Sequence, residues 1–290
     1  MRVLVVGAGL MGAQIGCEYA LGGHDVTLTA RDTARVVARV DDALSKAEDL
    51  HLFSPDEVAA ARARLGVDDD CAHDGWDLVV ESLPEDFELK AERLRPLAHA
   101  SREAILATNT SSLSISELGE AIGAPERTIG THYWNPPLLM PLVEVVAGEH
   151  TPPEVVELVS ETLDALGKRP VLVGDVPGFV WNRIQMGVLR EAAWIVENGV
   201  ASPDTVDDIL TYGLARRWRN VGFFEAIALG GVETWQRTSA NLLPELSSAT
   251  ELPDLRQWTK APEALADVAA LRDRGLACDL IEERSEHARP

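Results

Sequence analysis

Apolar and polar positions follow two different periods between residues 1 and 175. Short runs rich in β-branched residues, typical of buried strands, are separated by longer stretches whose apolar residues recur as on one face of a helix. This alternation predicts βαβ units on a mostly parallel sheet. The expected strands are Arg2–Val6, Asp25–Thr29, Leu78–Glu81, Ala104–Ala107, Thr128–His132, Leu142–Val146 and Val171–Val173, and the main expected helices are Leu10–Leu21, Thr33–Asp49, Pro55–Leu65, Phe87–Ala98 and Pro153–Leu166.

After Val173 the strand pattern ends, and the rest of the chain is predicted to be helical. The sequence Asp175-Val176-Pro177-Gly178 marks the boundary, because an acidic cap with Pro and Gly ends the preceding strand and opens a long helix. We therefore expect an α/β domain over residues 1–176 and an all-α domain over residues 177–290. The last segment, Ala261 to Pro290, is expected to be a charged helix that either faces solvent or docks on a second subunit.

The charge and the cysteines exclude several classes of protein. Lys and Arg number 26 against 47 Asp and Glu, which gives a formal net charge of −21. Nucleic-acid and anionic-membrane partners are disfavoured, because binding phosphate needs a basic face. Cys17, Cys71 and Cys278 have neither zinc-site nor disulfide-framework spacing, so we expect a reduced, cytoplasmic protein without a metal.

A glycine-rich motif, Gly7-Ala8-Gly9-Leu10-Met11-Gly12, lies between the first predicted strand and the first predicted helix. A Gly-x-Gly-x-x-Gly sequence in that context predicts a dinucleotide site, which would include Leu10 and Met11. The first glycine permits a tight turn, the second lets the backbone approach the pyrophosphate, and the third lets the helix pack closely on the sheet.

The end of the second predicted strand bears on the choice of cofactor. Ala30 stands where an acidic residue would bind the 2′-hydroxyl of NAD, and Arg31 follows it. This arrangement leaves room for a 2′-phosphate and supplies a guanidinium to bind it, which favours NADP over NAD. Two alternatives remain: Arg31 stacks on the adenine, or Asp32 takes the NAD role.

A histidine and a glutamate twelve residues apart are the candidate catalytic pair. His132 ends one predicted strand, Glu144 lies inside the next, and Asn135-Pro136-Pro137 forms a turn between them. Folding the second strand back would bring the carboxylate to the imidazole, fixing its tautomer and supporting its charged form. Such an acid–base pair suits alcohol oxidation beside a hydride acceptor.

Further motifs resemble the 3-hydroxyacyl-CoA dehydrogenase superfamily over essentially the whole chain. They are Val80-Glu81, Asn109-Thr110-Ser111-Ser112, His132-x-x-Asn135-Pro136, Leu142-Val143-Glu144-Val145 and Pro177-Gly178-Phe179-Val180-x-Asn182-Arg183. The resemblance implies a Rossmann-like NAD(P)-binding domain followed by a helical C-terminal domain that binds substrate and forms a homodimer.

The resemblance also implies a role for each site residue. His132 would be the general base that removes the hydroxyl proton, and Glu144 its partner. The other implied site residues are Ser111 and Asn182 around the reacting oxygen, Asn135 beside it, and Glu81 and Asn109 near the cofactor.

Within the superfamily, the chain is similar to the branch containing λ-crystallin/L-gulonate 3-dehydrogenase and L-carnitine dehydrogenase, which oxidise free 3-hydroxy acids. Pro84 to Lys90 and Gly213-Leu214-Ala215-Arg216-Arg217 carry this likeness, and Arg217 is thereby expected to contact substrate or cofactor. Ala215 and Phe223 depart from the branch, which has Gly and Pro there, so the substrate stays open.

The expected activity is the interconversion of a short 3-hydroxy acid and its 3-oxo acid with NAD(P). Relatives that use CoA bind its phosphates on the helical segment after the second strand, but here Asp41 to Asp49 holds one Lys among four acids. A 3-hydroxyacyl-CoA dehydrogenase and a non-catalytic NAD(P)-binding or crystallin-like protein remain alternatives. The β-hydroxyacid dehydrogenase group is disfavoured, because Gly178 stands where that group has a catalytic Lys.

Overall fold

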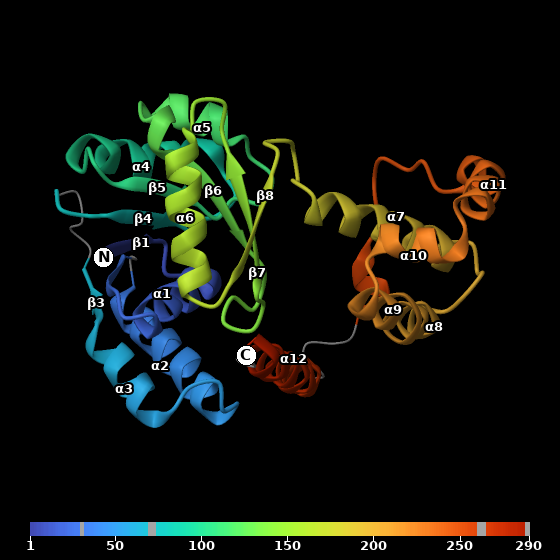
Figure 1. The fold of residues 1–290 in the computed structure, drawn as a ribbon, viewed down its shortest axis with the longest axis horizontal. Coiled ribbons are helices and arrows are strands. Elements are labelled where there is room, and N and C mark those ends of the chain that lie inside the picture. The colour runs from blue at the N-terminus through green and yellow to red at the C-terminus, as the bar shows by residue number, and fades with distance from the viewer. Residues whose placement is uncertain (30–31, 69–73, 260–264, 288–290) are drawn as a thin grey trace. The chain divides into compact units, whose positions relative to one another are not determined.

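Strands with apolar residues on both faces build the centre of the molecule. The computed structural model describes residues 1–29, 32–68, 74–259 and 265–287. Within them the strands form one sheet in the order β3-β2-β1-β4-β5-β6-β7-β8, parallel throughout except for the antiparallel pair β6 and β7 (Figure 1). The strands are β1 (Arg2–Val6), β2 (Asp25–Thr29), β3 (Leu65–Val67), β4 (Leu78–Glu81), β5 (Ile105–Thr108), β6 (Thr128–Tyr133), β7 (Leu142–Ala147) and β8 (Arg169–Val173).

Helices cover both faces of this sheet, as parallel strands require. On one face Ile15, Leu44 and Leu163 belong to a core formed with α1, α2, α3 and α6, and on the other Leu94 and Leu118 pack from α4 and α5. These helices are α1 (Leu10–Leu21), α2 (Thr33–Asp49), α3 (Pro55–Ala63), α4 (Phe87–Ala100), α5 (Ile115–Ile122) and α6 (Pro153–Ala165). The carboxyl ends of β1, β4 and β5 therefore meet at one edge of the sheet, where open α/β sheets bind ligands.

The predicted fold class, an α/β Rossmann-like domain followed by a helical one, is confirmed. Most expected elements agree with the structure to within one or two residues. The expected helix Pro55–Leu65 is wrong at its end, because Leu65 already begins the short edge strand β3 beside β2. A three-residue edge strand contains too few residues to show a period of two.

The chain divides into two compact units that differ from the expected domains. The first comprises Met1–Val180 and the chain from Ala266 onward, including helix α12 (Leu265–His287), and the second comprises Trp181–Leu265. The domain boundary expected between residues 176 and 177 therefore stays a prediction. The last helix groups with the α/β unit, an arrangement that its charged sequence did not predict.

The second unit is built from helices joined by irregular segments, with no strand among its described residues. It contains α7 (Trp181–Glu197), α8 (Pro203–Asp208), a π-helical segment Ile209–Ala215, α9 (Arg216–Asn220), α10 (Phe223–Gly230) and α11 (Val232–Leu242). Across both units, none of the described helices is long and apolar enough to cross a membrane.

Candidate active site

The glycine-rich turn between β1 and α1 has the geometry that the motif predicts. Gly7 has a φ of +94°, and a Cβ on Gly12 would lie 2.3 Å from the carbonyl oxygen of Gly7. Both positions therefore need glycine for the turn itself. Gly9 differs, because a Cβ there would meet nothing within 4 Å, so its glycine keeps open a space in front of the turn.

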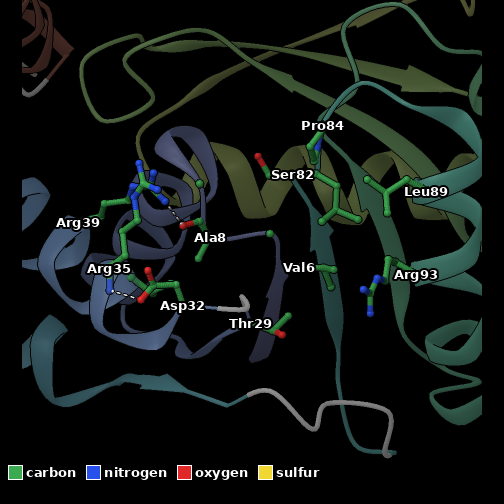
Figure 2. Close-up of a pocket in the computed structure, with 14 residues that line it drawn as sticks. Val6, Ala8, Thr29, Asp32, Arg35, Arg39, Ser82, Pro84, Leu89 and Arg93 are labelled. Carbon is green, nitrogen blue, oxygen red and sulfur yellow. Dashed lines mark hydrogen bonds between the residues drawn. The ribbon is translucent and has the colours of Figure 1, made fainter.

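A cavity of about 610 Å³ lies in front of this turn (Figure 2). Gly7 and Gly9 line it, with Arg35 and Arg39 of α2 on one side and Arg93 of α4 on the other. Nη1 of Arg39 donates to the carbonyl oxygen of Ala8 at 3.1 Å. The size of the cavity and the arginines that line it suit a dinucleotide with a charged pyrophosphate. The open space at Gly9 suits close approach of the pyrophosphate to the backbone.

The segment after β2, which ends at Thr29, bears on the choice of cofactor. Ala30 and Arg31, on which the choice of NADP depends, lie outside the described residues. Asp32 caps α2, its Oδ1 accepting from the amide of Arg35 at 3.0 Å. Its carboxylate also lines the cavity, so the alternative in which Asp32 contacts a ribose stays open.

Leu10 and Met11 of the motif do not line this cavity. Leu10 is exposed at the start of α1 and borders a second, smaller cavity, whereas Met11 packs against the apolar core. Their assignment to the cofactor site stays a prediction.

Glu81 has a structural role at the end of β4. Its side chain is fully buried, and Nζ of the buried Lys90 donates to its two oxygens at 2.7 and 2.9 Å. Oγ1 of Thr108 and the amide of Leu83 also donate to this carboxylate. Glu81 therefore fixes the loop from Ser82 to Pro84, which lines the cofactor cavity, and its own contact with cofactor stays a prediction.

Glu85 organises the loop that carries Ser111. Its Oε1 accepts from the amides of Ser111 and Ser112, both at 2.9 Å, and from Oγ1 of Thr110 at 2.6 Å. Burial by itself raises the pKa of Glu85, but these hydrogen bonds and the nearby Lys90 outweigh it, so the pKa lies below its ordinary value. This residue was not predicted from the sequence, because a single Glu in a loop gives no pattern.

Asn109 connects that loop to the strand of the candidate base. Its side-chain Oδ1 accepts from the backbone amide of Tyr133 at 2.8 Å, and its backbone amide donates to the carbonyl oxygen of Glu81. Asn109 thus joins the ends of β4, β5 and β6, and any contact with cofactor stays a prediction.

His132 and Glu144 face each other across β6 and β7. The register of the antiparallel pair sets them opposite, and Nδ1 of His132 lies 2.7 Å from Oε2 of Glu144. Both side chains are buried, and the other oxygen of Glu144 accepts from the amide of Val180 at 3.0 Å. With Glu144 acting as an ionised acceptor, the contact assigns the proton to Nδ1 and leaves Nε2 as the nitrogen that could accept a proton.

The turn that reverses the chain between these strands is held by Lys168. Its Nζ is buried and donates to the carbonyl oxygens of Pro137 at 2.7 Å and Met140 at 2.9 Å, and it forms an ion pair with Glu18 of α1. Burial raises the pKa of Glu18, although the charge of Lys168 acts in the opposite direction. Lys168 thereby links the cofactor-side helix to the turn carrying Asn135, a connection invisible in the sequence.

The remaining predicted residues belong to the second unit. Asn182 lies in the first turn of α7, and Arg217 is exposed on α9. The α/β unit thus brings His132 and Glu144 together, whereas the approach of Asn182 and Arg217 to them stays a prediction. Among the described residues, no group of three or more His, Cys, Asp or Glu side chains is arranged to hold a metal.

A parallel sheet with a glycine-rich turn, a cavity before it and a buried histidine–carboxylate pair are the features expected of a dehydrogenase with a nicotinamide cofactor. Residues 2–176 match the family model for the NAD-binding domain of 3-hydroxyacyl-CoA dehydrogenase, and residues 178–264 match that for its C-terminal domain. The chain therefore belongs to the 3-hydroxyacyl-CoA dehydrogenase superfamily.

Three of the relatives have three different named activities. The chain is 32% identical to a 5-formyl-3-hydroxy-2-methylpyridine 4-carboxylate 5-dehydrogenase of Mesorhizobium japonicum, covering 87% of this chain and 82% of the relative. It is 30% identical to an L-carnitine dehydrogenase of the same organism, covering 98% and 76%. It is 37% identical to a probable 3-hydroxybutyryl-CoA dehydrogenase of Deinococcus radiodurans, covering 74% and 78%.

A solved enzyme structure is similar to this protein over the whole chain. It is the crystal structure of a 5-formyl-3-hydroxy-2-methylpyridine 4-carboxylic acid 5-dehydrogenase described as an NAD⁺-dependent dismutase. The TM-score is 0.86 at 28% identity, covering 100% of this chain and 99% of the other. With the L-carnitine dehydrogenases among the relatives, the expected branch of the superfamily is supported, and the protein is an enzyme of the hydroxyacid and acyl-CoA dehydrogenase type.

The open space at Gly9 gives a test of the cofactor site. Gly9 has φ −72° and ψ −154°, which any residue adopts, so Gly9→Ala is expected to keep the Tm of the free protein. The added methyl group would obstruct the pyrophosphate, and the Kd for NAD(P)H, measured by fluorescence titration, is expected to rise roughly tenfold or more. Gly187→Ala, in open space on α7, is the control. Unchanged cofactor affinity in Gly9→Ala would contradict the placement.

Proposed function

We propose that the protein interconverts a short, free 3-hydroxy acid and its 3-oxo acid with NAD(P), using His132 as the acid–base group. The observation that carries the proposal is the buried pair of His132 and Glu144, 2.7 Å apart. A carboxylate in an apolar strand is costly to bury unless it is paired, so a buried Glu144 calls for a partner and for a role that offsets this cost. Its position beside the ends of the cofactor-binding strands makes acid–base catalysis the account that fits.

Each residue has its own part in the proposed reaction. The cofactor, when bound, accepts a hydride from C3 of the hydroxy acid. Nε2 of His132 removes the hydroxyl proton, and Glu144 holds the imidazole in the required tautomer and balances the charge that forms on it. Ser111 and Asn182 hold the reacting oxygen, Asn135 lies beside it, and Arg217 is a further contact to substrate or cofactor.

Removing the imidazole tests this assignment. His132→Ala is expected to lower kcat by roughly 10²- to 10⁴-fold, the usual contribution of a general acid–base group, with the Kd for NAD(P)H unchanged. His99→Ala, at an exposed histidine in the last turn of α4, is the matched control. Turnover in His132→Ala at the wild-type rate would remove the proposed role, whether or not the protein is a dehydrogenase.

A free acid is preferred to a CoA thioester on the evidence of charge. The acidic residues of α2 lie where CoA relatives need cations. A nucleotide phosphate would be repelled by these negative side chains. The similarity to a probable 3-hydroxybutyryl-CoA dehydrogenase keeps the thioester reaction as the second candidate.

NADP is the preferred cofactor in this proposal. The sequence supports it through Ala30 and Arg31, and the structure adds the exposed Arg35, which lines the cavity one helical turn further on. Asp32 is engaged in capping α2, which reduces its availability to a ribose hydroxyl.

The cofactor preference predicts a measurable ratio. The wild-type kcat/KM for NADPH is expected to exceed that for NADH by roughly tenfold or more, because hydrogen bonds to a charged group contribute about 1.5–3 kcal/mol. Arg31→Ala and Arg35→Ala should reduce the ratio. Arg93→Ala, on the opposite side of the cavity, is the control and should affect both cofactors equally. A ratio that favours NADH in the wild type would contradict the preference.

The protein is also proposed to be a cytoplasmic homodimer. Cys17 and Cys278 are free thiols, as a reducing compartment favours. The second unit exposes large apolar side chains, among them Phe224, Leu229 and Tyr212, which are more than 70% exposed. Sedimentation as a monomer at micromolar concentration would exclude the dimer.

A further inference from the structure

The last helix of the chain packs on the unit that carries the candidate base. Ala277 and Leu280 of α12 are buried in a small apolar cluster with Leu52, after α2, and Leu139, in the turn between β6 and β7. Nη1 of Arg284 donates to the carbonyl oxygen of Leu52 at 3.3 Å. Helix α12 therefore lies beside the turn between β6 and β7 and packs against it through apolar side chains.

Between α12 and this turn lies a second cavity of about 230 Å³. Its lining extends from Leu10, at the start of α1, to Asn135 and Pro136, which follow His132 by three and four residues. The cavity thus adjoins both the glycine-rich turn before α1 and the turn between β6 and β7 that follows His132. It is below the roughly 300–1,000 Å³ of pockets for drug-sized ligands, so its volume suits a small molecule.

Two cations at this cavity are held in place by one buried carboxylate. Arg272 of α12 and Lys46 of α2 both line the cavity, and both pair with Asp273, whose side chain is 2% exposed. Nε of Arg272 donates to Oδ1 of Asp273 at 2.8 Å. Two cations on one carboxylate leave a net charge of +1 in this group and leave N–H donors for another acceptor. Fixing the side chains in advance lowers the entropy cost of binding an anion.

We propose that this cavity binds the carboxylate end of the substrate, with Arg272 and Lys46 as its ligands and α12 as the wall that limits substrate length. The inference rests on the proposed function, because it names the site of the free acid in that reaction. It places the carboxylate on the α/β unit itself, whereas the sequence drew attention to Arg217 of the second unit. In this proposal α12 helps to select the substrate, because its Arg272 binds the carboxylate.

Asp42 decides between two kinds of occupant. It lies one turn before Lys46 on α2, lines the same cavity and is exposed to solvent. If the cavity binds a carboxylate, Asp42 opposes binding, and Asp42→Asn should maintain or increase affinity for the acid. If it binds a quaternary ammonium group instead, the same substitution should weaken binding.

The direct test is calorimetric titration of the full-length protein loaded with NADP⁺, which cannot reduce the ligand, with acetoacetate and with its neutral methyl ester. The wild type is expected to bind the acid more tightly than the ester. Arg272→Met should weaken binding of the acid by roughly 10- to 100-fold, leave the ester unaffected and leave the Kd for NADPH unchanged. Arg274→Met, an exposed arginine of α12 outside the cavity lining, is the matched control. Lys46→Met should act in the same direction as Arg272→Met.

The outcomes separate this inference from the proposed function. If acetoacetate is reduced but Arg272→Met and Lys46→Met bind it like the wild type, the cavity assignment is wrong and the proposed function stands. If acetoacetate binds through Arg272 but no 3-oxo acid is reduced, the site stands and the proposed function is wrong. Equal loss of affinity in Arg272→Met and Arg274→Met would also overturn the inference, because only a general charge effect would remain.

Discussion

The buried contact between His132 and Glu144 is the constraint on which the site depends. A carboxylate 2% exposed in an apolar strand is tolerable only beside a partner, so β7 has to run antiparallel to β6 with these two residues in register. A parallel strand would enter through a long crossover and could not set residues 132 and 144 opposite each other. The antiparallel pairing of β6 and β7, in a sheet whose other described pairs are parallel, is therefore the feature that brings His132 and Glu144 into contact.

Charged side chains hold three loops of the α/β unit in place. Glu81 with Lys90 fixes the loop after β4, and Lys168 with Glu18 fixes the turn after β6. Asp175, which is half-buried after β8, accepts from the amides of Ile115 and Ser116 at the start of α5. Each group satisfies backbone atoms of a different loop through charge-assisted hydrogen bonds.

The sequence was sufficient where local pattern and chemistry coincide. Strand and helix periods located the sheet, and the spacing of His132, the Pro-rich turn and Glu144 predicted a contact that the structure contains. It was insufficient where function depends on distant pairing. Glu85 and Lys168 act on backbone atoms of other loops, and α12 returns from the end of the chain to Leu52 and Leu139, for which a charged helical pattern gives no indication.

In the proposed reaction, His132 and Glu144 act on a short free acid whose carboxylate binds in a cavity lined partly by α12. The most direct measurement compares kcat/KM for acetoacetate and acetoacetyl-CoA with NADPH, followed by the absorbance of the reduced nicotinamide. The account predicts a preference for the free acid of roughly tenfold or more, since only the acid offers the carboxylate that the cavity would bind. A preference for the thioester would contradict it.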